Sequence, residues 1–288
     1  MDGRGAAAVT SWTDRRLRVR FAEWNSLDGS GAVPEDRVMP ALDHLTRDAY
    51  PKSNGYDAKW LVDLDMGPHP LWLLEDLAAD LDLRPGMRVL DLGSGLGATS
   101  VFLAREYGVS VVAADLWVDP TEAAAVFRKE GVDDRVLAMR VDAHALPFGR
   151  GSFDAILSID AWEYFGTGDH YPPYLATFLK PGGQLGVATP ALTTEVRELG
   201  EIPDHIDRVV GAESAAWHTA DWLRSQWDFS RAFTTVTARN QPDACANWLL
   251  WERAVMELKG QASSPVQGML EADGGAFVTF ALVTGRVA

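Results

Sequence analysis

Short apolar runs alternate with helical segments between residues 88 and 189, and this rhythm limits the possible folds more than any other feature. Five of the runs are predicted to be strands: Arg88–Leu92, Val109–Ala114, Val136–Val141, Phe153–Ile159 and Gly183–Thr189. Helical segments lie between them, at about 96–106, 120–130 and 170–179. Strands joined by helices form right-handed βαβ units, so the rhythm predicts a parallel α/β sheet with both faces covered.

The segments on either side complete a doubly wound, mostly parallel sheet of seven strands. A helix is predicted from about Pro70 to Leu83, and two late apolar alternations, Phe233–Ala238 and Ala276–Val287, are predicted to be closing strands. We therefore expect one domain over residues 1–288. Its expected parts are an N-terminal cap or lid (1–68), a core (69–190), a helical cap insertion (191–230) and closing strands of the core (231–288).

Composition narrows the possible partners. The chain is 47% hydrophobic and contains eleven Trp, which excludes a disordered chain. Its 26 basic and 41 acidic residues give a net charge of −15, which disfavours nucleic acid and anionic membrane surfaces as partners. The basic run Arg15–Arg20 is the exception, and we interpret it as the solvated face of a short helix.

The expected compartment is the cytoplasm. Cys245 is the single cysteine and cannot form an internal disulfide, which fits a reducing environment. The chain has no run of about 18 apolar residues and no apolar signal segment near Met1, so no stable membrane insertion is expected. A homo-oligomer stays open.

A glycine-rich loop follows the first predicted strand, in the order Asp91-Leu92-Gly93-Ser94-Gly95-Leu96-Gly97. Glycines there permit positive φ and a close approach of backbone amides to a ligand. A dinucleotide fingerprint needs a glycine three residues after the second, and Ala98 occupies that position. The loop also lacks the Lys-Ser/Thr pair of a phosphate-binding Walker loop. The spacing therefore favours a nucleotide-like ligand other than a dinucleotide.

Further motifs follow the loop in a fixed order. Asp115 ends the second strand, Asp142-Ala143 opens a stretch to Phe148 after the third, and Leu179-Lys180-Pro181-Gly182-Gly183 leads into the fifth. Over about residues 70–190 this series resembles class I S-adenosylmethionine-dependent methyltransferases. The group it is most similar to includes quinone-biosynthesis, sterol and cyclopropane-synthase-like enzymes (methyltransferase type 11). The resemblance implies a Rossmann-like methyltransferase fold, S-adenosyl-L-methionine as cofactor, and a small-molecule acceptor.

The resemblance also implies which residues bind the cofactor. Asp115 would accept both ribose hydroxyls, and a carboxylate can accept two donors from a vicinal diol. Asp91 would orient the loop or accept from the ligand's ammonium, and the stretch after Asp142 would lie beside the adenine. The expected cofactor-binding residues are Asp91, Gly93, Ser94, Gly95, Gly97, Asp115, Leu116, Asp142, Ala143, Asp160, Tyr50 and Asn54.

The loop after the fourth strand, Asp160–Gly166, is expected to face the transferable methyl group. Methyl transfer is an in-line displacement, and a base is needed only if the nucleophile arrives protonated. Glu163 is the first candidate for a general base or for holding a substrate cation, against the alternative of a solvated loop carboxylate. Tyr164, His170 and His218 are further catalytic candidates. The histidines lack the paired spacing of a metal site, so no metal is expected.

Aromatic residues are the candidates for the acceptor pocket. The segment Tyr50–Trp60 resembles the stretch with which related enzymes cover the cofactor, and it is either such a lid or a polar loop pinned by aromatics. From it, Tyr56 and Trp60 are expected to contact the substrate, together with Trp162 and Trp217.

Two other functions remain possible from the sequence. An NAD-dependent oxidoreductase would share the fold, and the glycine spacing weighs against it. A non-catalytic S-adenosylmethionine-binding protein would keep the loop and lack an acceptor pocket, which the intact loop and the aromatic cap disfavour.

Overall fold

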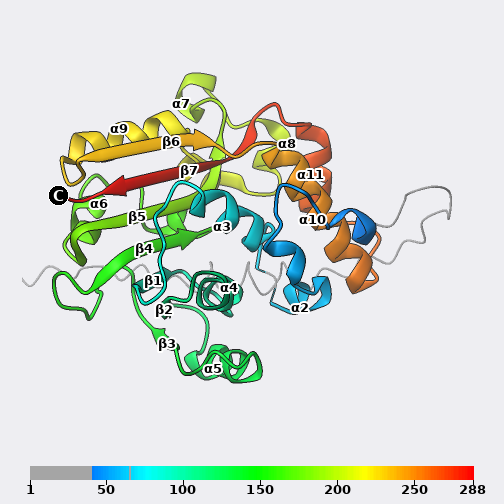
Figure 1. Ribbon diagram of the computed structural model, residues 1–288. Helices are drawn as coiled ribbons and strands as arrows, with labels where there is room; N and C mark the ends of the chain where they lie inside the picture. Colours follow the sequence, from blue (N-terminus) through cyan, green and yellow to red (C-terminus); the bar gives the residue numbers. More distant parts are fainter. Residues whose placement is uncertain (1–40, 65) are drawn as a thin grey trace, which may run out of the picture.

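A computed structural model describes residues 41–64 and 66–288 and confirms the predicted architecture. Seven strands form one sheet in the order β3-β2-β1-β4-β5-β7-β6 (Figure 1). Strands β1 to β5 run parallel, whereas β7 is antiparallel to both β5 and β6. The strands are β1 (Arg88–Leu92), β2 (Ser110–Asp115), β3 (Val136–Arg140), β4 (Phe153–Ile159), β5 (Leu179–Leu192), β6 (Thr235–Asn240) and β7 (Val278–Arg286).

Helices cover both faces of the sheet, as the βαβ rhythm predicts. The main helices beside the sheet are α3 (Pro70–Ala78), α4 (Ala98–Tyr107), α5 (Pro120–Lys129), α9 (Ala220–Ser230), α10 (Ala244–Lys259) and α11 (Pro265–Asp273), together with the shorter α6 (Tyr171–Ala176). Helices α3 and α4 lie on the face turned toward the viewer in Figure 1. Short helical turns complete the described chain: η1 (Ala41–His44), η2 (Ser53–Gly55), α2 (Ala58–Asp63), η3 (Trp162–Tyr164), α7 (Val196–Leu199), α8 (Asp204–Asp207) and η4 (Gly211–Ala216).

Strand β1 divides the core between the two faces because its side chains alternate. Val89 packs with the residues of α3 and α4, while Leu90 and Leu92 pack with α6 and α9. Asp91 lies on the α4 face, although it is fully buried. Burial of a charged carboxylate costs free energy, so packing alone does not explain an aspartate at this position.

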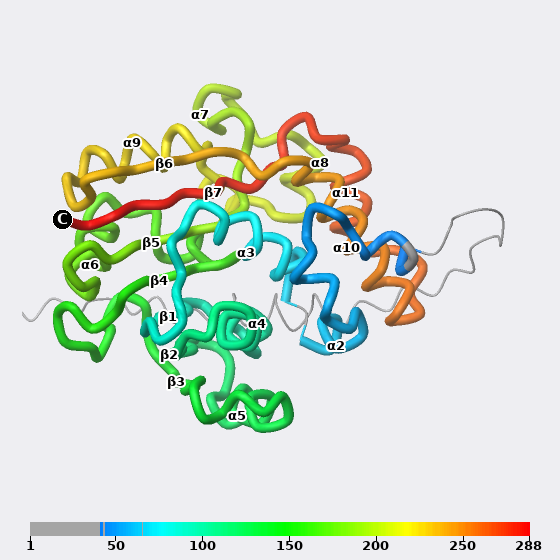
Figure 2. Tube along the Cα trace, in the orientation of Figure 1, coloured from blue at the N-terminus to red at the C-terminus, as the bar shows by residue number. Residues whose placement is uncertain are grey.

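The described part of the N-terminal cap packs against the C-terminal part of the chain. Helix η1 lies beside α10, and the backbone N–H of Ala41 donates to Glu257 at 2.9 Å (Figure 2). The basic run Arg15–Arg20 and the rest of residues 1–40 lie outside the described residues, so their predicted structure stays a prediction. The division of the chain into cap, core, insertion and closing strands likewise stays a prediction.

Two helices between β6 and β7 were not predicted. Helices α10 and α11 lie within residues 244–273. For residues 231–288 the sequence predicted only the closing strands of the core. Their signals are local: Trp248, Trp251 and Val255 have helical spacing and are buried, and Ser264 caps α11. Strand β5 also runs longer than predicted because antiparallel β7 pairs with it as far as Leu192.

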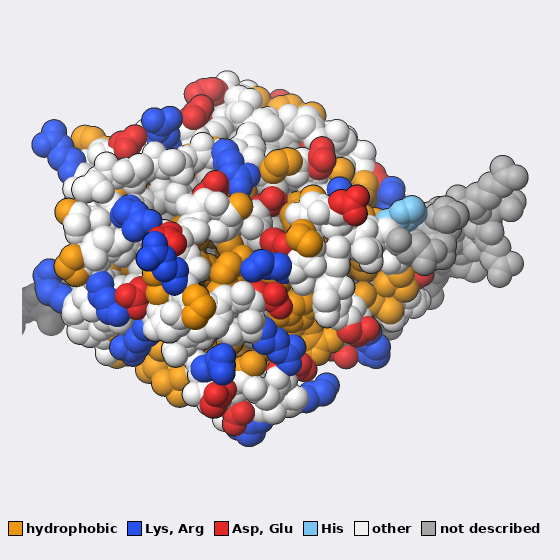
Figure 3. All heavy atoms as spheres, in the orientation of Figure 1, with side chains coloured by type: hydrophobic (Ala, Val, Ile, Leu, Met, Phe, Trp, Pro, Cys, Tyr) orange, Lys and Arg blue, Asp and Glu red, His pale blue; other side chains and the backbone are white. Residues whose placement is uncertain are grey.

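Charged side chains of both signs are interspersed over the face shown in Figure 3. None of the helices in the described part of the chain is long and apolar enough to cross a membrane.

Candidate functional site

The glycine loop turns sharply between β1 and α4. Gly93, Gly95 and Gly97 have φ of 80°, 53° and 94°, values that side chains with a Cβ rarely adopt. The N–H groups of Gly93 and Ser94 both donate to the carbonyl of Ala114, at 2.8 and 3.3 Å. Gly97 then begins helix α4, so the loop ends at the N-terminus of a ten-residue helix. A glycine loop that ends at a helix N-terminus is suited to bind an anion or a nucleotide-like ligand.

Asp91 sits directly below this loop. Its Oδ2 accepts hydrogen bonds from the hydroxyls of Thr99 (2.7 Å) and Ser100 (2.6 Å), both in the first turn of α4. The other oxygen, Oδ1, is buried and has no hydrogen-bond partner among the described residues. Burial raises the pKa of Asp91 to about 6, although the two hydroxyls oppose the shift and the nearby charge of Asp115 adds to it. This buried oxygen needs a donor from outside the described chain.

Asp115, at the end of β2, ties the loop to the next strand. Its Oδ2 accepts from the N–H of Gly95 at 2.9 Å, and its Oδ1 accepts from the N–H groups of Trp117 and Val118. These three N–H groups occupy three of about four lone-pair positions of the carboxylate, so Oδ2 can still accept one hydroxyl of a diol. Leu116 is 42% exposed beside it and offers an apolar contact surface.

The turn after β3 supplies the expected adenine side of the site. Asp142 is exposed, and its Oδ1 accepts from the N–H of His144 at 2.8 Å. Ala143 is buried, and its carbonyl accepts from the hydroxyl of Tyr171 at 3.0 Å. The turn is thus fixed to α6 and leaves the Asp142 carboxylate accessible.

The segment after β4 closes over the loop from the other side. Asp160 has a φ of 54°, rare for a residue with a Cβ, and its N–H donates to Ala188 at 2.8 Å. A Cβ at Gly93 would overlap the methyl group of Ala161, with Phe165 beside it. Trp162 is fully buried among Phe165, Tyr171 and Trp227 and is part of the hydrophobic core. Its expected contact with the substrate stays a prediction.

Glu163 lies in η3, directly after β4. Its Oε2 accepts from the hydroxyl of Thr189 on β5 at 2.9 Å. Burial raises the pKa of Glu163 to about 7, and the charge of Glu213 on η4 contributes to the increase. Tyr164 is 40% exposed and packs edge-on against Trp117, with 5.0 Å between ring centroids. A carboxyl group with a pKa near 7 can exchange a proton at neutral pH.

A short segment before α3 covers the loop. The sulfur of Met66 would lie 2.7 Å from a Cβ on Gly95, and the Asp160 carboxylate would overlap a Cβ on Gly67. The indole N–H of Trp251 on α10 donates to the Gly67 carbonyl at 3.1 Å. A ligand that reaches Gly95 must displace the Met66 side chain, whose thioether is flexible.

Other predicted lid residues lie outside this cluster. The hydroxyl of Tyr50 is buried and donates to Asp76 at 2.9 Å. Asn54 closes its own loop through two hydrogen bonds with the backbone of Arg47. Neither is brought to the glycine loop by these contacts, and their roles stay predictions.

Tyr56 and Trp60 pack together at 5.7 Å between ring centroids. The Tyr56 hydroxyl donates to Glu106 in the last turn of α4. Glu106 lies about 13 Å along the helix axis from Gly97, at the opposite end of the helix. The expected substrate contacts of Tyr56 and Trp60 therefore stay predictions.

The remaining candidates lie near the ends of β4 and β5. His170 is exposed and precedes α6. Trp217 is buried against Trp248, and its carbonyl accepts from the N–H of Leu192 at 3.1 Å. His218, the next residue, hydrogen bonds with Glu195 at 2.9 Å. Among the described residues no group of His, Cys, Asp and Glu could hold a metal ion.

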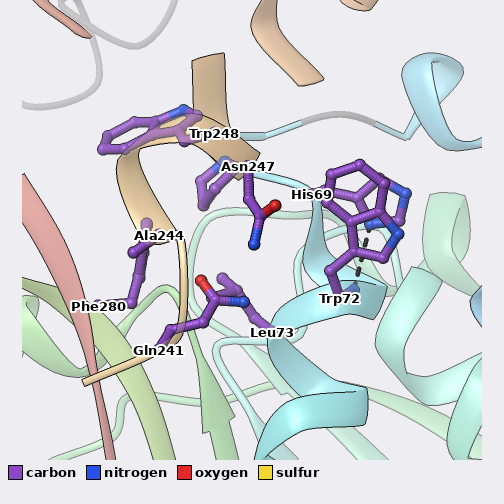
Figure 4. Close-up of a pocket in the computed structure, with 9 residues that line it drawn as sticks. His69, Trp72, Leu73, Gln241, Ala244, Asn247, Trp248 and Phe280 are labelled. Atoms are coloured by element: carbon purple, nitrogen blue, oxygen red, sulfur yellow. Dashed lines mark hydrogen bonds between the residues drawn. The ribbon is translucent and has the colours of Figure 1, made fainter. Parts of the chain in front are cut away.

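A small pocket lined in part by Pro68 lies at the N-terminus of α3 (Figure 4). Its volume of about 10 Å³ is room for roughly one water molecule. Burial lowers the pKa of His69 there to about 3, so this imidazole is neutral and acts as the N-cap of α3. The other lining residues are Trp72, Leu73, Gln241, Ala244, Asn247, Trp248 and Phe280.

Several residues of this site were not predicted from the sequence. Thr99 and Ser100 carried a local signal, two hydroxyls in the first helical turn after the loop. Met66 and Glu195 had no such signal, because their places depend on how distant segments pack.

Comparison with known proteins agrees with this geometry. Residues 89–183 match the family model of a methyltransferase domain, from β1 to the beginning of β5. Methyltransferase GfsG of Streptomyces halstedii is 36% identical over 117 residues, 40% of this chain and 42% of that protein. The 27-O-demethylrifamycin SV methyltransferase of Amycolatopsis mediterranei is 30% identical over 154 residues, 51% of this chain and 57% of that protein. Neither match reaches two thirds of the relative's length.

Solved structures share the fold. Phosphoethanolamine N-methyltransferase 2 of Haemonchus contortus, in complex with S-adenosyl-L-methionine, superimposes with a TM-score of 0.63 at 20% identity. The match covers 88% of this chain and 61% of that one. The predicted Rossmann-like methyltransferase fold is therefore confirmed.

Proposed function

Because residues 89–183 belong to the methyltransferase-domain family, we propose that this chain binds S-adenosyl-L-methionine and transfers its methyl group to a small molecule. The acceptor class is a specialised metabolite, a quinone or a lipid-like precursor, and the atom methylated is O, N or C. Relatives with such names support the proposal, among them a methylphytylhydroquinone methyltransferase of Synechocystis that is 34% identical over 106 residues.

The buried, unpartnered Oδ1 of Asp91 is the observation that carries the proposal. One oxygen of this carboxylate accepts from Thr99 and Ser100, and the other is buried without a donor among the described residues. The ammonium of an amino-acid ligand would satisfy this oxygen and offset its burial. The methionine part of the cofactor carries such an ammonium.

The remaining cofactor contacts follow from the positions of the other candidates. Gly93 and Gly95 allow backbone to approach the methionine part, because neither carries a Cβ. The remaining position on Oδ2 of Asp115 accepts from a ribose hydroxyl, and Asp142 with Ala143 lies at the adenine. Asp160, whose carboxylate lies against Gly67, is the further cofactor candidate after β4.

Glu163 is the acceptor-facing group of the proposal. The bound cofactor supplies a methyl group on a positively charged sulfur. The chain's own residues hold the nucleophile in line with that methyl group and exclude water. A carboxyl with a pKa of about 7 can accept a hydrogen bond from the acceptor or hold a cationic one, and Thr189 fixes its orientation.

The two other functions have less support. An oxidoreductase would need the third glycine at the position of Ala98, and the matched family model is that of a methyltransferase domain. A cofactor sensor without catalysis would not need a carboxyl with a pKa near 7 at the acceptor end.

Methyl transfer from radiolabelled S-adenosylmethionine to a panel of hydroxylated, aminated and unsaturated small molecules tests the proposal. We expect label in at least one acceptor class. Glu163→Gln removes a charged hydrogen bond of about 1.5–3 kcal/mol to the acceptor, so turnover should fall by about 10- to 100-fold while cofactor affinity changes less than twofold. Glu122→Gln, an exposed change on α5, is the matched control. Full turnover in Glu163→Gln would remove Glu163 from the mechanism.

The partners proposed with this function are small molecules rather than nucleic acid, because a net charge of −15 repels phosphate backbones. A cytoplasmic location is proposed from the single buried cysteine, Cys245, which fits a reducing compartment. Light scattering of the purified full chain tests for a homo-oligomer.

A further inference from the structure

His218 and Glu195 form a carboxylate–imidazole pair at the beginning of α9. The Nδ1 atom of His218 lies 2.9 Å from Oε2 of Glu195, and the two side chains are only 13% and 16% exposed. The other oxygen of Glu195 accepts from the N–H of Thr219 at 2.7 Å. The imidazole stacks on Trp222, with 3.6 Å between ring centroids and 11° between planes. Both members of the pair are therefore fixed in position.

The partners of Glu195 determine the tautomer of His218. Burial opposes ionisation of Glu195, but the hydrogen bonds from His218 and Thr219 outweigh it and hold its pKa below the usual range. An ionised carboxylate only accepts, so Nδ1 carries the proton. In the neutral imidazole the other nitrogen, Nε2, is then a free base. No described residue hydrogen bonds to Nε2.

The pair lies at the same edge of the sheet as the proposed methyl-transfer site. Glu195 follows the carboxyl end of β5, and Thr189, six residues earlier, holds Glu163. Turn η4, which directly precedes Trp217 and His218, carries Glu213, whose charge acts on both Glu163 and Tyr164. Trp222 packs onto the core cluster that contains Trp162, the neighbour of Glu163. Glu195 is the charged group in contact with His218 among the described residues.

We propose that His218 is the general base of the reaction, that Glu195 is its positioning residue, and that the acceptor group is a hydroxyl. This inference rests on the proposed function. Nε2 takes the hydroxyl proton as the acceptor oxygen bonds to the methyl carbon. The carbon–sulfur bond breaks, its electron pair stays on sulfur, and the neutral thioether S-adenosylhomocysteine remains. The imidazolium, stabilised by Glu195, then releases the proton to water. A base is required because a hydroxyl nucleophile arrives protonated.

A purely structural role for the pair would be to hold the entry to α9. The bond from Thr219 to Glu195 serves that purpose without an imidazole, and the Thr219 side chain already caps the helix at Trp222. The two roles differ in one measurable respect. A base that contacts the acceptor lies close to the sulfonium and experiences its charge strongly, whereas that charge is screened at a histidine more than about 10 Å away.

The test measures the pKa of His218 by NMR in the full chain labelled with ¹⁵N in its six histidines. His218→Asn assigns the resonance by its loss. Saturating S-adenosylmethionine and S-adenosylhomocysteine are compared, because they differ by one methyl group and one positive charge. We expect a pKa lower by about half a pH unit or more with S-adenosylmethionine, since a nearby positive charge disfavours the imidazolium.

His205 is the matched control, because it forms a similar pair with buried Asp273, 2.9 Å away, between α8 and α11. Its pKa should be the same in both complexes. An equal pKa of His218 in the two complexes would overturn the assignment of the base. Failure of either ligand to bind would instead overturn the proposed function. Transfer of label to an amine or an unsaturated carbon, with hydroxyl compounds unlabelled, would overturn the acceptor class.

Discussion

The carboxylate of Asp91 lies 2.6 Å from the hydroxyl of Ser100, nine residues later on α4, and this bond holds a fully buried acid beneath the glycine loop. Ser100 and Thr99 satisfy one oxygen and leave Oδ1 for a ligand. The first strand, the loop and the first helix thus act as one binding unit. The arrangement is unfavourable for the empty protein, because an ionised buried acid has lost its hydration.

Replacement of Asp91 by Asn should weaken cofactor binding while the protein still folds. Asp91→Asn keeps the shape and removes the charge, so the ammonium loses a charged hydrogen bond that contributes about 1.5–3 kcal/mol. Titration calorimetry with S-adenosylhomocysteine should show an affinity lower by about 10- to 100-fold. Asp133→Asn, at an exposed position, is the control and should bind like the original chain. Equal affinity in both variants would show that Asp91 is not a ligand contact.

The raised pKa of Asp91 predicts how stability and affinity depend on pH. The folded pKa of about 6 lies above the unfolded value of about 3.9, so the native state binds the extra proton and loses stability as pH rises from about 4 to 6. Asp91→Asn should therefore melt at a higher temperature than the original chain at pH 7.5 without ligand, and the difference should vanish near pH 4. Affinity for S-adenosylhomocysteine should depend on pH in the opposite sense, because the ligand's ammonium binds the ionised form of Asp91. We expect the affinity to fall about tenfold per pH unit below pH 6. A melting-temperature difference that is the same at pH 4 and pH 7.5 would contradict this account.

Gly93 should tolerate no side chain. At a φ of 80° an alanine costs about 1–2 kcal/mol, and its Cβ would overlap that of Ala161. We expect Gly93→Ala to lower the melting temperature and to weaken S-adenosylhomocysteine binding at least tenfold. Gly55→Ala, where a Cβ meets no atom within 4 Å, is the control for substitution itself. A Gly93→Ala protein with normal affinity would mean that the ligand does not approach this backbone.

The parts of the fold predicted best were those with a local pattern. Strands β1 and β4 have the predicted bounds, Arg88–Leu92 and Phe153–Ile159, because short apolar runs between turns define them. The end of β5 was underestimated because its last residues pair with β7, about 90 residues later. Helices α10 and α11 were overlooked although their apolar spacing was readable.

The same distinction holds for the site. The glycine loop, Asp91 and Asp115 could be named from spacing and come together in the structure. The cover formed by Met66 could not, because it depends on the approach of a separate segment to Gly95. His218 could be listed only as one of several histidines, since its partner Glu195 has no sequence signal.

The identity of the donor ligand is the central claim, and calorimetric titration of the full chain with S-adenosylhomocysteine and, in parallel, with NADH tests it most directly. We predict a single-site isotherm with S-adenosylhomocysteine, strongly reduced in Asp91→Asn, and no heat of binding with NADH. Binding of NADH without binding of S-adenosylhomocysteine would contradict the account.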